Sequence, residues 1–345
     1  MSGANDTEPV AAAFAARQSE REERELSPLA ARSYPALRAR AEDDCGLRTP
    51  FQRDRDRIVH CKAFRRLTHK TQVFVAPLGD HYRTRLTHTL EVTTISRTVA
   101  RALGLNEDLV EAIGLGHDLG HPPFGHIGEE ALDASLKERF GREFRHYEHS
   151  LRVVEVLERG GAGLNLTEQV REGIVGHSSR APLPVTLEGR IVRVIDRVAY
   201  LNHDIDDAMR AGLLRAGDLP ERPIAVLGET GSRRIDALVH DMVEHSQREG
   251  DITQGHEAGS AMMELRKFMF EHVYLGPAVR AERERITNVV RKLFDHYVEH
   301  PDLLPDDGAA GRDVAERVTD YVAGMTDRYC IREYTDLEVP RVFAR

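Results

Sequence analysis

Apolar residues recur at the spacing of an α-helix along most of the chain. Between residues 86 and 103 they form one amphipathic stripe, and Gly104 is suited to end the predicted helix. Asn106 is a good N-cap for a second helix, whose apolar residues lie over 109–113. A third stripe runs through residues 187–205 and predicts a long helix.

Strand-like alternation of apolar and polar residues is scarce. Helix-breaking residues predict irregular connections at 182–185 and 220–227. More glycine and charge over residues 213–260 predicts a less regular excursion. We therefore expect an all-α fold with two or three short strands at most.

The chain of 345 residues is long enough to bury a substantial core. Residues 1–26 are rich in Ala, Glu and Arg, which predicts a polar N-terminal tail that is mobile or loosely helical. We expect residues 27–345 to form one helical domain, with a core at about 50–210 and a C-terminal helical extension over 211–345.

Composition and charge narrow the function. The hydrophobic content of 41% and charged content of 30% are typical of a soluble globular protein, and the net charge of −9 argues against a strongly basic nucleic-acid binder. We interpret the arginine-rich stretch 53–66 mainly as ion-paired helix faces, with binding of single-stranded DNA as the alternative. The three cysteines form no CxxC pair, which indicates free thiols. With no signal-like segment and no run of about 18 apolar residues, we expect a cytoplasmic protein without a membrane partner.

The candidate chemistry centres on histidine followed by aspartate. Three such dipeptides occur, beginning at His117, His203 and His240. The first lies in the run 117–126, where glycines and prolines force a sharp turn and three histidines gather with one aspartate. Imidazole and carboxylate together suit a divalent cation with open coordination positions. The alternative is a set of surface histidines on a loop.

A second candidate carboxylate, Asp196, interrupts the apolar stretch 191–200. A carboxylate beside a core face is costly unless it is paired or binds a metal, and a salt bridge to Arg193 or Arg197 is the alternative. His88, taken alone, is more typical of a satisfied helix histidine.

Three carboxylates and one tyrosine share a face of the predicted third helix. Asp196, Tyr200, Asp204 and Asp207 follow one another at spacings of four, four and three residues. The carboxylates repel one another, which favours a cation or polar ligand at this face. A solvated acidic face is the competing interpretation.

Together these patterns resemble the HD superfamily, and within it the deoxynucleoside triphosphate triphosphohydrolases. The resemblance covers most of the chain after residue 45, and its most specific part joins residues 83–92 with 117–129. The further matching segments are 53–58, 64–67, 70–74, 187–189, 196–208 and 323–329.

The resemblance implies a metal site and a catalytic group. It implies that a divalent cation is bound by His88, His117, Asp118 and Asp196. We expect Mg²⁺ or Mn²⁺, with Zn²⁺, Ni²⁺ or Fe²⁺ as alternatives. The catalytic residues that it implies are His126, Glu129 as the carboxylate that orients it, and His146 near the phosphates.

The resemblance also implies substrate contacts along the pocket. These are Gln72 and Arg85 at the nucleoside and α-phosphate, Tyr200 and Asp204 at the sugar, and His121 and Arg197 near the phosphates. Tyr200 would pack where a 2′-hydroxyl fits badly, and Asp204 would accept the 3′-hydroxyl. One departure is that Tyr147 and His149 stand where many relatives carry Asn and Gln, which affects the expected phosphate contacts and substrate preference.

The implied reaction converts a deoxynucleoside triphosphate and water into deoxynucleoside and inorganic triphosphate. The resemblance further implies a homo-oligomer, with a hexamer as one form, and a deoxynucleoside triphosphate effector as an option. Two rival functions stay open: another HD phosphohydrolase, such as a nucleoside monophosphatase or cyclic-nucleotide phosphodiesterase, or a noncatalytic nucleotide sensor. A P-loop nucleotidase is disfavoured because the sequence has no GxxxxGK[ST] run.

Overall fold

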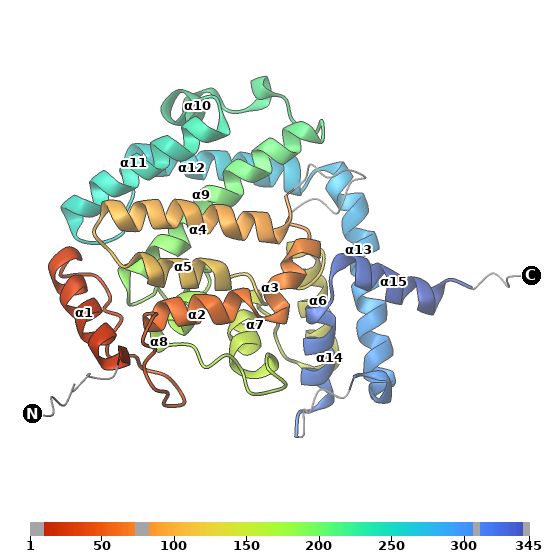
Figure 1. The fold of residues 1–345 in the computed structure, drawn as a ribbon. Coiled ribbons are helices and arrows are strands. Elements are labelled where there is room, and N and C mark those ends of the chain that lie inside the picture. Colours follow the sequence, from red (N-terminus) through yellow and green to blue (C-terminus); the bar gives the residue numbers. More distant parts are fainter. Residues whose placement is uncertain (1–9, 73–82, 306–310, 341–345) are drawn as a thin grey trace, which may run out of the picture.

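The computed structural model describes residues 10–72, 83–305 and 311–340. Over these ranges the chain forms fifteen α-helices and no β-strand (Figure 1). The only extended pairings among them are two isolated bridges, between Arg38 and Thr167 and between Thr71 and Thr84. The all-α prediction is therefore confirmed. The matching segment 70–74 continues past Gln72 into residues outside the described ranges, as do residues 1–9 of the predicted tail.

The helices of the first two thirds of the chain contain the predicted core. They are α1 (Val10–Glu25), α2 (Pro50–Val59), α3 (Lys62–Arg66), α4 (Arg85–Ala102), α5 (Glu107–Gly116), α6 (Gly125–Phe140), α7 (His146–Arg152), α8 (Glu168–Gly176) and α9 (Leu187–Arg210). The later helices are α10 (Glu221–Leu227), α11 (Gly231–Glu249), α12 (His256–Met269), α13 (Pro277–Glu299), α14 (Val314–Gly324) and α15 (Asp327–Glu338). Single 3-10 turns are η1 (Leu67–His69), η3 (Ala216–Asp218) and η5 (Pro301–Leu303), and π-helical turns are η2 (Val153–Leu157) and η4 (Phe270–Tyr274).

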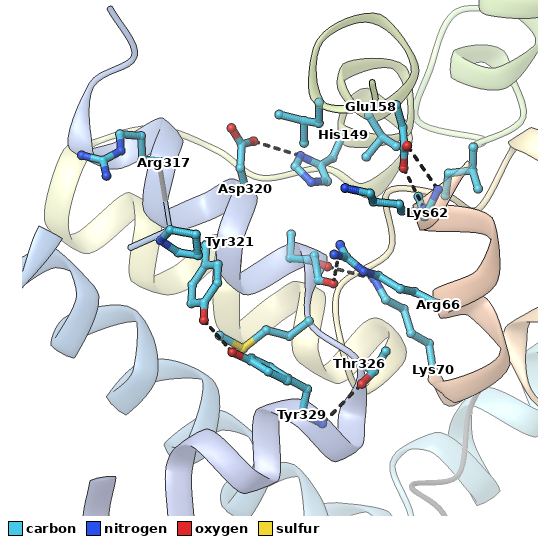
Figure 2. A pocket seen from close by; sticks show the side chains of 18 of the residues that line it. Lys62, Arg66, Lys70, His149, Glu158, Arg317, Asp320, Tyr321, Thr326 and Tyr329 are labelled. Carbon is cyan, nitrogen blue, oxygen red and sulfur yellow. Dashed lines mark hydrogen bonds and ion pairs between the residues drawn. The ribbon is translucent and has the colours of Figure 1, made fainter. Parts of the chain in front are cut away.

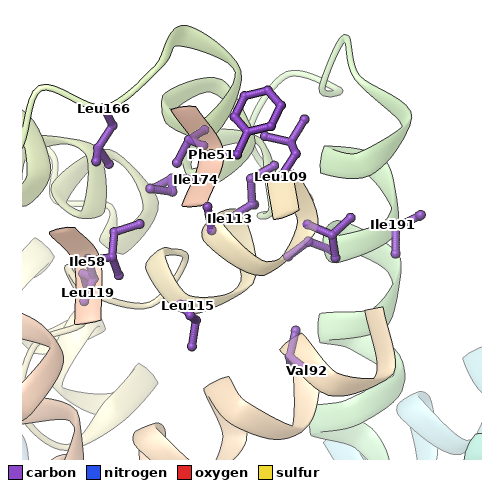
Figure 3. Close-up of a cluster of buried hydrophobic side chains, with 14 of the residues drawn as sticks. Phe51, Ile58, Val92, Leu109, Ile113, Leu115, Leu119, Leu166, Ile174 and Ile191 are labelled. Atoms are coloured by element: carbon purple, nitrogen blue, oxygen red, sulfur yellow. The ribbon is translucent and has the colours of Figure 1, made fainter. Parts of the chain in front are cut away.

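Helix α5 lies at the centre of the main core, in contact with α2, α4, α8 and α9. Its apolar residues are buried, and Leu109 and Ile113 have no exposed surface (Figure 3), whereas Glu107 and Glu111 pair with arginines at its edge. Burial of each such side chain contributes about 1.5–3 kcal/mol. Helix α8 approaches closely because Gly173 faces Ile113: an added Cβ would lie 2.3 Å from the Ile113 Cδ1 atom.

The predicted helix boundaries agree with the structure at the elements that carry the site. Helix α4 ends just before Gly104, which has a φ of 64°. Asn106 caps α5 by accepting a hydrogen bond from the Leu109 amide at 3.2 Å. Helix α9 begins at Leu187, as the third stripe predicted, and Thr186 caps it.

Two predicted irregular segments are helical instead. Residues 221–227 form α10, and α11 occupies much of the 213–260 excursion, whereas 182–185 is irregular as predicted. Thr230 caps α11, and the buried side chains of Leu238 and Met242 lie one turn apart on its inner face. The glycines counted against a helix lie at its ends, so they terminate it without interrupting it.

The described part of the predicted tail is a regular helix, α1. Its last turn is attached to the core: Glu22 accepts from the Ser33 amide at 2.8 Å, and the Ser27 amide donates to the Gly104 carbonyl at 2.7 Å. At the other end of the chain, α13 and α14 pack on α6 around a second apolar cluster. A third cluster joins the C-terminal half of α9 to α12 and η4. None of the described helices combines the length and the apolar character that a membrane span requires.

Candidate active site

Three helices bring the four predicted metal ligands together. His88 from α4 and Asp196 from α9 meet at 3.0 Å between Nε2 and Oδ1. His117, at the C-terminal end of α5, places Nε2 at 3.6 Å from Asp118 Oδ1 and 3.8 Å from Asp196 Oδ1. The alternative salt bridge of Asp196 is not formed with Arg193, whose guanidinium donates to backbone carbonyls of the 176–182 segment.

The orientation of His117 fits a metal ligand. Its Nδ1 donates to the Gly114 carbonyl at 2.7 Å, so Nε2 is the ring nitrogen that faces the carboxylates. This Nε2 is fully buried and has no hydrogen-bond partner among the described residues, although two carboxylates face it. Two imidazoles with two carboxylates are a donor set that a divalent cation accepts. The residues present therefore fit the metal that the sequence implied.

The two carboxylates are held in their ionised form. Burial opposes ionisation at both, but neighbouring groups outweigh it and leave the pKa of each below its ordinary value. At Asp118 the opposing groups are His117 and Arg85, and at Asp196 they are the hydrogen bond from His88 and the His117 ring. Ionised carboxylates are the form that binds a cation.

Arg85 and Gln72 lie beside this cluster with unused polar atoms. Arg85 is 1% exposed, and its Nη1 donates to Asp118 Oδ2 at 2.7 Å while Nε and Nη2 lack a described partner. The Gln72 Oε1 atom is likewise buried without a described partner. Gly125 allows this close arrangement: its φ is 60°, and an added Cβ would lie 2.8 Å from the Gln72 carbonyl oxygen. The arrangement leaves guanidinium donors for an anionic ligand.

Glu129 on α6 orients two histidines at once. Its Oε2 lies 3.2 Å from His126 Nδ1, and its Oε1 lies 2.8 Å from His146 Nδ1. Burial opposes ionisation of Glu129, yet these two hydrogen bonds hold its pKa far below the ordinary value. The His126 side chain is 68% exposed, so its free ring edge can reach a ligand. The His121 ring stacks on His146 with centroids 4.0 Å apart.

His177 is a site residue that sequence reasoning missed. Its Nε2 lies 3.3 Å from His146 Nε2, and its ring packs edge-on against His117. Burial lowers the pKa of His177 to about 3. A local signal could have found it, because a Gly-His pair closes α8 at 176–177 just as another closes α5 at 116–117.

Comparison with known proteins identifies the family of the chain. Residues 85–201 match the HD domain, and residues 252–336 match the phosphohydrolase-associated domain. The chain is 51% identical over 319 residues to a deoxyguanosinetriphosphate triphosphohydrolase-like protein of Caldanaerobacter subterraneus, covering 91% of this chain and 93% of that protein. The chain belongs to this family of HD phosphohydrolases.

Other relatives carry the same name. The protein of Clostridium perfringens is 46% identical, with 88% of this chain and 91% of that protein covered. The protein of Brucella canis is 39% identical, with 91% and 96% covered. Among solved structures, a hypothetical protein from Aquifex aeolicus has a TM-score of 0.47 and 22% identity, over 81% of this chain and 67% of that chain. Membership of the family, together with the donor set above, supports a metal-dependent phosphohydrolase.

Further along α9 the HD phosphohydrolase presents the two residues predicted to meet a sugar. The Tyr200 hydroxyl accepts from Arg266 Nε at 2.8 Å, and Asp204 accepts a short hydrogen bond from the Tyr274 hydroxyl. Burial raises the pKa of Asp204 to about 7. Arg266 and Tyr274 were missed from the sequence because they lie on α12 and η4, more than sixty residues away in the chain.

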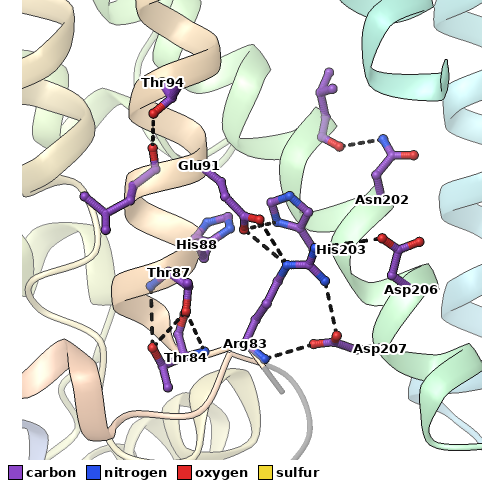
Figure 4. Close-up of polar contacts among 12 residues, drawn as sticks. Arg83, Thr84, Thr87, His88, Glu91, Thr94, Asn202, His203, Asp206 and Asp207 are labelled. Carbon is purple, nitrogen blue, oxygen red and sulfur yellow. Dashed lines mark hydrogen bonds and ion pairs between the residues drawn. The ribbon is translucent and has the colours of Figure 1, made fainter. Parts of the chain in front are cut away.

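The carboxylates on one face of α9, Asp196, Asp204 and Asp207, form hydrogen bonds or ion pairs with residues of other elements. Asp207 accepts from the Arg83 amide at 3.3 Å and from its Nη1 at 3.2 Å (Figure 4). Arg83 also contacts Glu91, which faces His203 Nδ1 at 3.2 Å. With Asp196 on His88 and Asp204 on Tyr274, the stripe is not a solvated acidic face.

Of the three remaining residues from the sequence analysis, Arg197 and Tyr147 lie next to residues of the site and His149 faces another helix. Arg197 follows Asp196 on α9 and forms no ion pair with a described carboxylate. Tyr147 is buried next to His146, with ring centroids 5.6 Å apart. His149 instead faces Asp320 of α14, with Nδ1 3.9 Å from Oδ1. The side chains at these two departures from the family pattern therefore have different surroundings, and of the two only Tyr147 lies against His146.

Proposed function

We propose that the protein hydrolyses deoxynucleoside triphosphates to deoxynucleoside and inorganic triphosphate in the presence of a divalent cation. The observation that carries the proposal is the order of groups on α9. Tyr200 and Asp204 lie one and two turns beyond Asp196, about 6 Å and about 12 Å along the axis. This is the order of α-phosphate and sugar in a nucleotide. The names of the relatives support the same substrate class.

The phosphate end is formed by the metal ligands and Arg85. His88, His117 and Asp196 have ligand atoms close enough to share one ion, with Asp118 Oδ1 3.6 Å from His117 Nε2, and a divalent cation held there would supply a Lewis acid for a phosphoryl oxygen. Arg85 is fixed by Asp118 and offers its unused guanidinium donors to the α-phosphate. Donors that are already in place stabilise developing negative charge without reorganisation.

His126 is placed to act as a general acid. Its Nδ1 is held by Glu129, and the opposite ring edge is open to a ligand. As water oxygen bonds to the α-phosphorus, the bond to the 5′-oxygen breaks and its electron pair stays on that oxygen. A proton from His126 then completes the deoxynucleoside, the proton lost by the attacking water passes to solvent, from which His126 is reprotonated, and triphosphate leaves. A histidine suits this role near neutral pH.

The sugar end selects a deoxyribose. The Asp204 carboxylate, already positioned by Tyr274, can accept the sugar 3′-hydroxyl. The Tyr200 ring, fixed by Arg266, occupies the space beside the sugar where a 2′-hydroxyl would project. Steric exclusion of this kind gives specificity by disfavouring the competing ligand.

Product analysis tests the proposal. Each deoxynucleoside and ribonucleoside triphosphate, and in parallel nucleoside monophosphates and cyclic nucleotides, is incubated with Mg²⁺ or Mn²⁺, and products are separated by chromatography. We expect deoxynucleoside and inorganic triphosphate in equal amounts. Orthophosphate from nucleoside monophosphates, or ring opening of cyclic nucleotides, without triphosphate release would assign the protein to another class of HD phosphohydrolase. Binding without any product would assign it to noncatalytic sensing.

A further inference from the structure

The segment 323–329 matches the family in sequence, but it contains none of the site residues that the resemblance implies. In the structure it forms the junction of α14 and α15, where Thr326 caps α15 and Asp327 is the first residue of that helix. Asp327 is only 5% exposed. A buried carboxylate is costly unless hydrogen bonds satisfy it, so the partners of Asp327 indicate what it holds in place.

The Asp327 carboxylate accepts hydrogen bonds from two backbone amides of the HD part of the chain. Its Oδ1 accepts from the Phe124 amide and its Oδ2 from the Thr71 amide, at 2.9 Å each. Thr71 directly precedes Gln72, and Phe124 lies two residues before His126. One carboxylate therefore joins the segment expected to reach the substrate to the turn that carries the proposed general acid.

Lys70 makes a reciprocal connection between the same three segments. It is 3% exposed, and its ammonium donates to the carbonyls of His121 in the turn and of Ala323 in α14. Lys70 and Thr326 lie on the wall of a cavity of about 710 Å³ (Figure 2), whereas Asp327 does not line it. The Asp327 contacts are therefore part of the packed interior, behind this cavity wall.

The turn needs such support because its backbone is unusual just before His126. Phe124 has a φ of 62° and Gly125 a φ of 60°, so two successive residues adopt the left-handed conformation. This conformation is uncommon for a residue with a Cβ atom and persists only where the surroundings maintain it. Phe124 is also the N-cap of α6, and no side chain caps this helix start. Without Asp327 the buried Phe124 amide loses its acceptor.

Other contacts hold the proposed phosphate-binding groups in place independently of Asp327. The Arg85 guanidinium is fixed by Asp118, and Thr84 caps the start of α4. None of the four proposed metal ligands is a hydrogen-bond partner of the Asp327 carboxylate. Loss of the Asp327 contacts should therefore shift the turn while the metal ligands and Arg85 keep their places.

We propose that Asp327 is a positioning residue that sets the place of His126 relative to Arg85. It acts through the backbone of the turn, because its hydrogen bonds go to amides and not to the His126 ring. The inference rests on the proposed function, in which His126 protonates the 5′-oxygen. It assigns the junction of α14 and α15 a part in that reaction.

Asp327→Asn tests the proposal with almost no change of shape. The amide side chain offers one acceptor oxygen, so one of the two backbone amides faces an NH₂ group instead. With dGTP and Mn²⁺ we expect kcat to fall about 10–100-fold and KM to change less than about threefold, because a displaced catalytic group slows the reaction while substrate contacts remain. Elemental analysis should find the metal content of the native protein.

A double-mutant cycle with His126→Ala separates positioning from general destabilisation. If Asp327 acts through His126, the double variant should have a kcat within about twofold of that of His126→Ala alone. A purely structural role lowers kcat by the same factor in both backgrounds, and that result overturns the proposal. A native kcat in the single variant Asp327→Asn overturns it as well.

Hydrogen exchange without nucleotide tests the contacts separately from the reaction. We expect peptides that contain Phe124 or Thr71 to exchange about tenfold or more faster in Asp327→Asn than in the native protein. Unchanged exchange at both places overturns the positioning role, whatever the protein hydrolyses. Faster exchange in a protein that releases no triphosphate from any nucleotide instead refutes the proposed function, and with it the part of Asp327 in the reaction.

Asp313→Asn is the matched control, because Asp313 stands at the start of α14 and accepts from the Glu316 amide at 2.8 Å. Asn caps a helix about as well as Asp, so kcat and exchange in the turn should equal the native values. If Asp327→Asn does not fold, Asp327→Glu takes its place in the cycle, since it keeps two acceptor oxygens on a longer side chain. A loss of kcat in Asp327→Glu that persists in the His126→Ala background overturns the proposal.

Discussion

The Nε2 atoms of His146 and His177 lie 3.3 Å apart, although each ring already donates a hydrogen bond through Nδ1. His177 donates to the Ile174 carbonyl at 2.6 Å, so its Nε2 is an acceptor. Two lone pairs cannot face each other at this distance without repulsion. The contact therefore requires a proton or a cation shared between the two nitrogens, while Glu129 holds the His146 ring through Nδ1.

This relationship makes His177 a positioning residue for His146. We expect His177→Ala to retain bound metal and to lower kcat by about 10–100-fold, the range for lost supporting partners, with little change in KM. His177→Gln offers an amide oxygen as acceptor and should restore part of the rate. Elemental analysis and steady-state kinetics check this. Loss of metal from His177→Ala would identify the residue as a ligand instead, since Asp118, His146 and His177 also form a group that could hold a cation.

The metal site itself predicts one tightly bound divalent cation per chain. His117→Ala or Asp196→Ala should remove metal and activity together, because each leaves the remaining buried donors with an incomplete set. The matched control is His240→Ala, which alters the exposed His-Asp dipeptide on α11. Elemental analysis of the three proteins is the measurement. Full occupancy in both site variants is the outcome that contradicts the assignment.

Removal of the proposed general acid separates catalysis from binding. His126→Ala should keep metal and nucleotide binding and lose about 10²–10⁴-fold in turnover, the usual contribution of a positioned acid. The metal is unaffected because the largely exposed His126 ring contacts Glu129 and none of the proposed ligands. His60→Ala, at the exposed end of α2, is the control. An unchanged rate in His126→Ala would transfer the acid role to His121 or His146.

Much of the site could be predicted because local sequence encodes it. The His-rich turn 117–126, the carboxylate at Asp196 and the boundaries of α4, α5 and α9 each follow from a short pattern. Arg266 and Tyr274 could not be found in this way, because only the packing of α12 and η4 on α9 brings them to Tyr200 and Asp204. Helices α10 and α11 were missed because glycines that end helices were counted as helix breakers.

His149 should make the protein sensitive to acid. Burial lowers its pKa to about 4, against about 6.5 in an unfolded chain. Below pH 6.5 the unfolded state takes up a proton that the folded state refuses, so stability falls as pH decreases from about 6.5 toward 4. His149→Gln removes this group, so relative to the variant the native chain should lose about 2 kcal/mol of unfolding free energy between pH 7.5 and pH 5.

Urea denaturation of both proteins at several pH values measures this difference. Above pH 7 the offset between their unfolding free energies should be constant, because His149 is neutral in both states there. His60→Gln, at an exposed position, controls for the loss of an ordinary histidine. Parallel curves for native protein and His149→Gln down to pH 5 would refute the prediction.

Discrimination against ribonucleotides should depend on the α9 pair and its partners. In the native protein we expect kcat/KM for dGTP to exceed that for GTP by about 10²-fold or more, because the Tyr200 ring occupies the space of the 2′-hydroxyl. Tyr200→Ala should reduce this ratio, mainly by raising the rate with GTP.

Tyr274→Phe removes the donor that positions Asp204, so it should lower kcat/KM for both nucleotides while the ratio changes less. Tyr297→Phe is the matched control, since the buried Tyr297 hydroxyl also donates to a carboxylate, that of Glu333, on the C-terminal helices. Equal kcat/KM values for dGTP and GTP in the native protein would refute the deoxynucleotide substrate. A ratio that survives Tyr200→Ala would assign the exclusion to another residue.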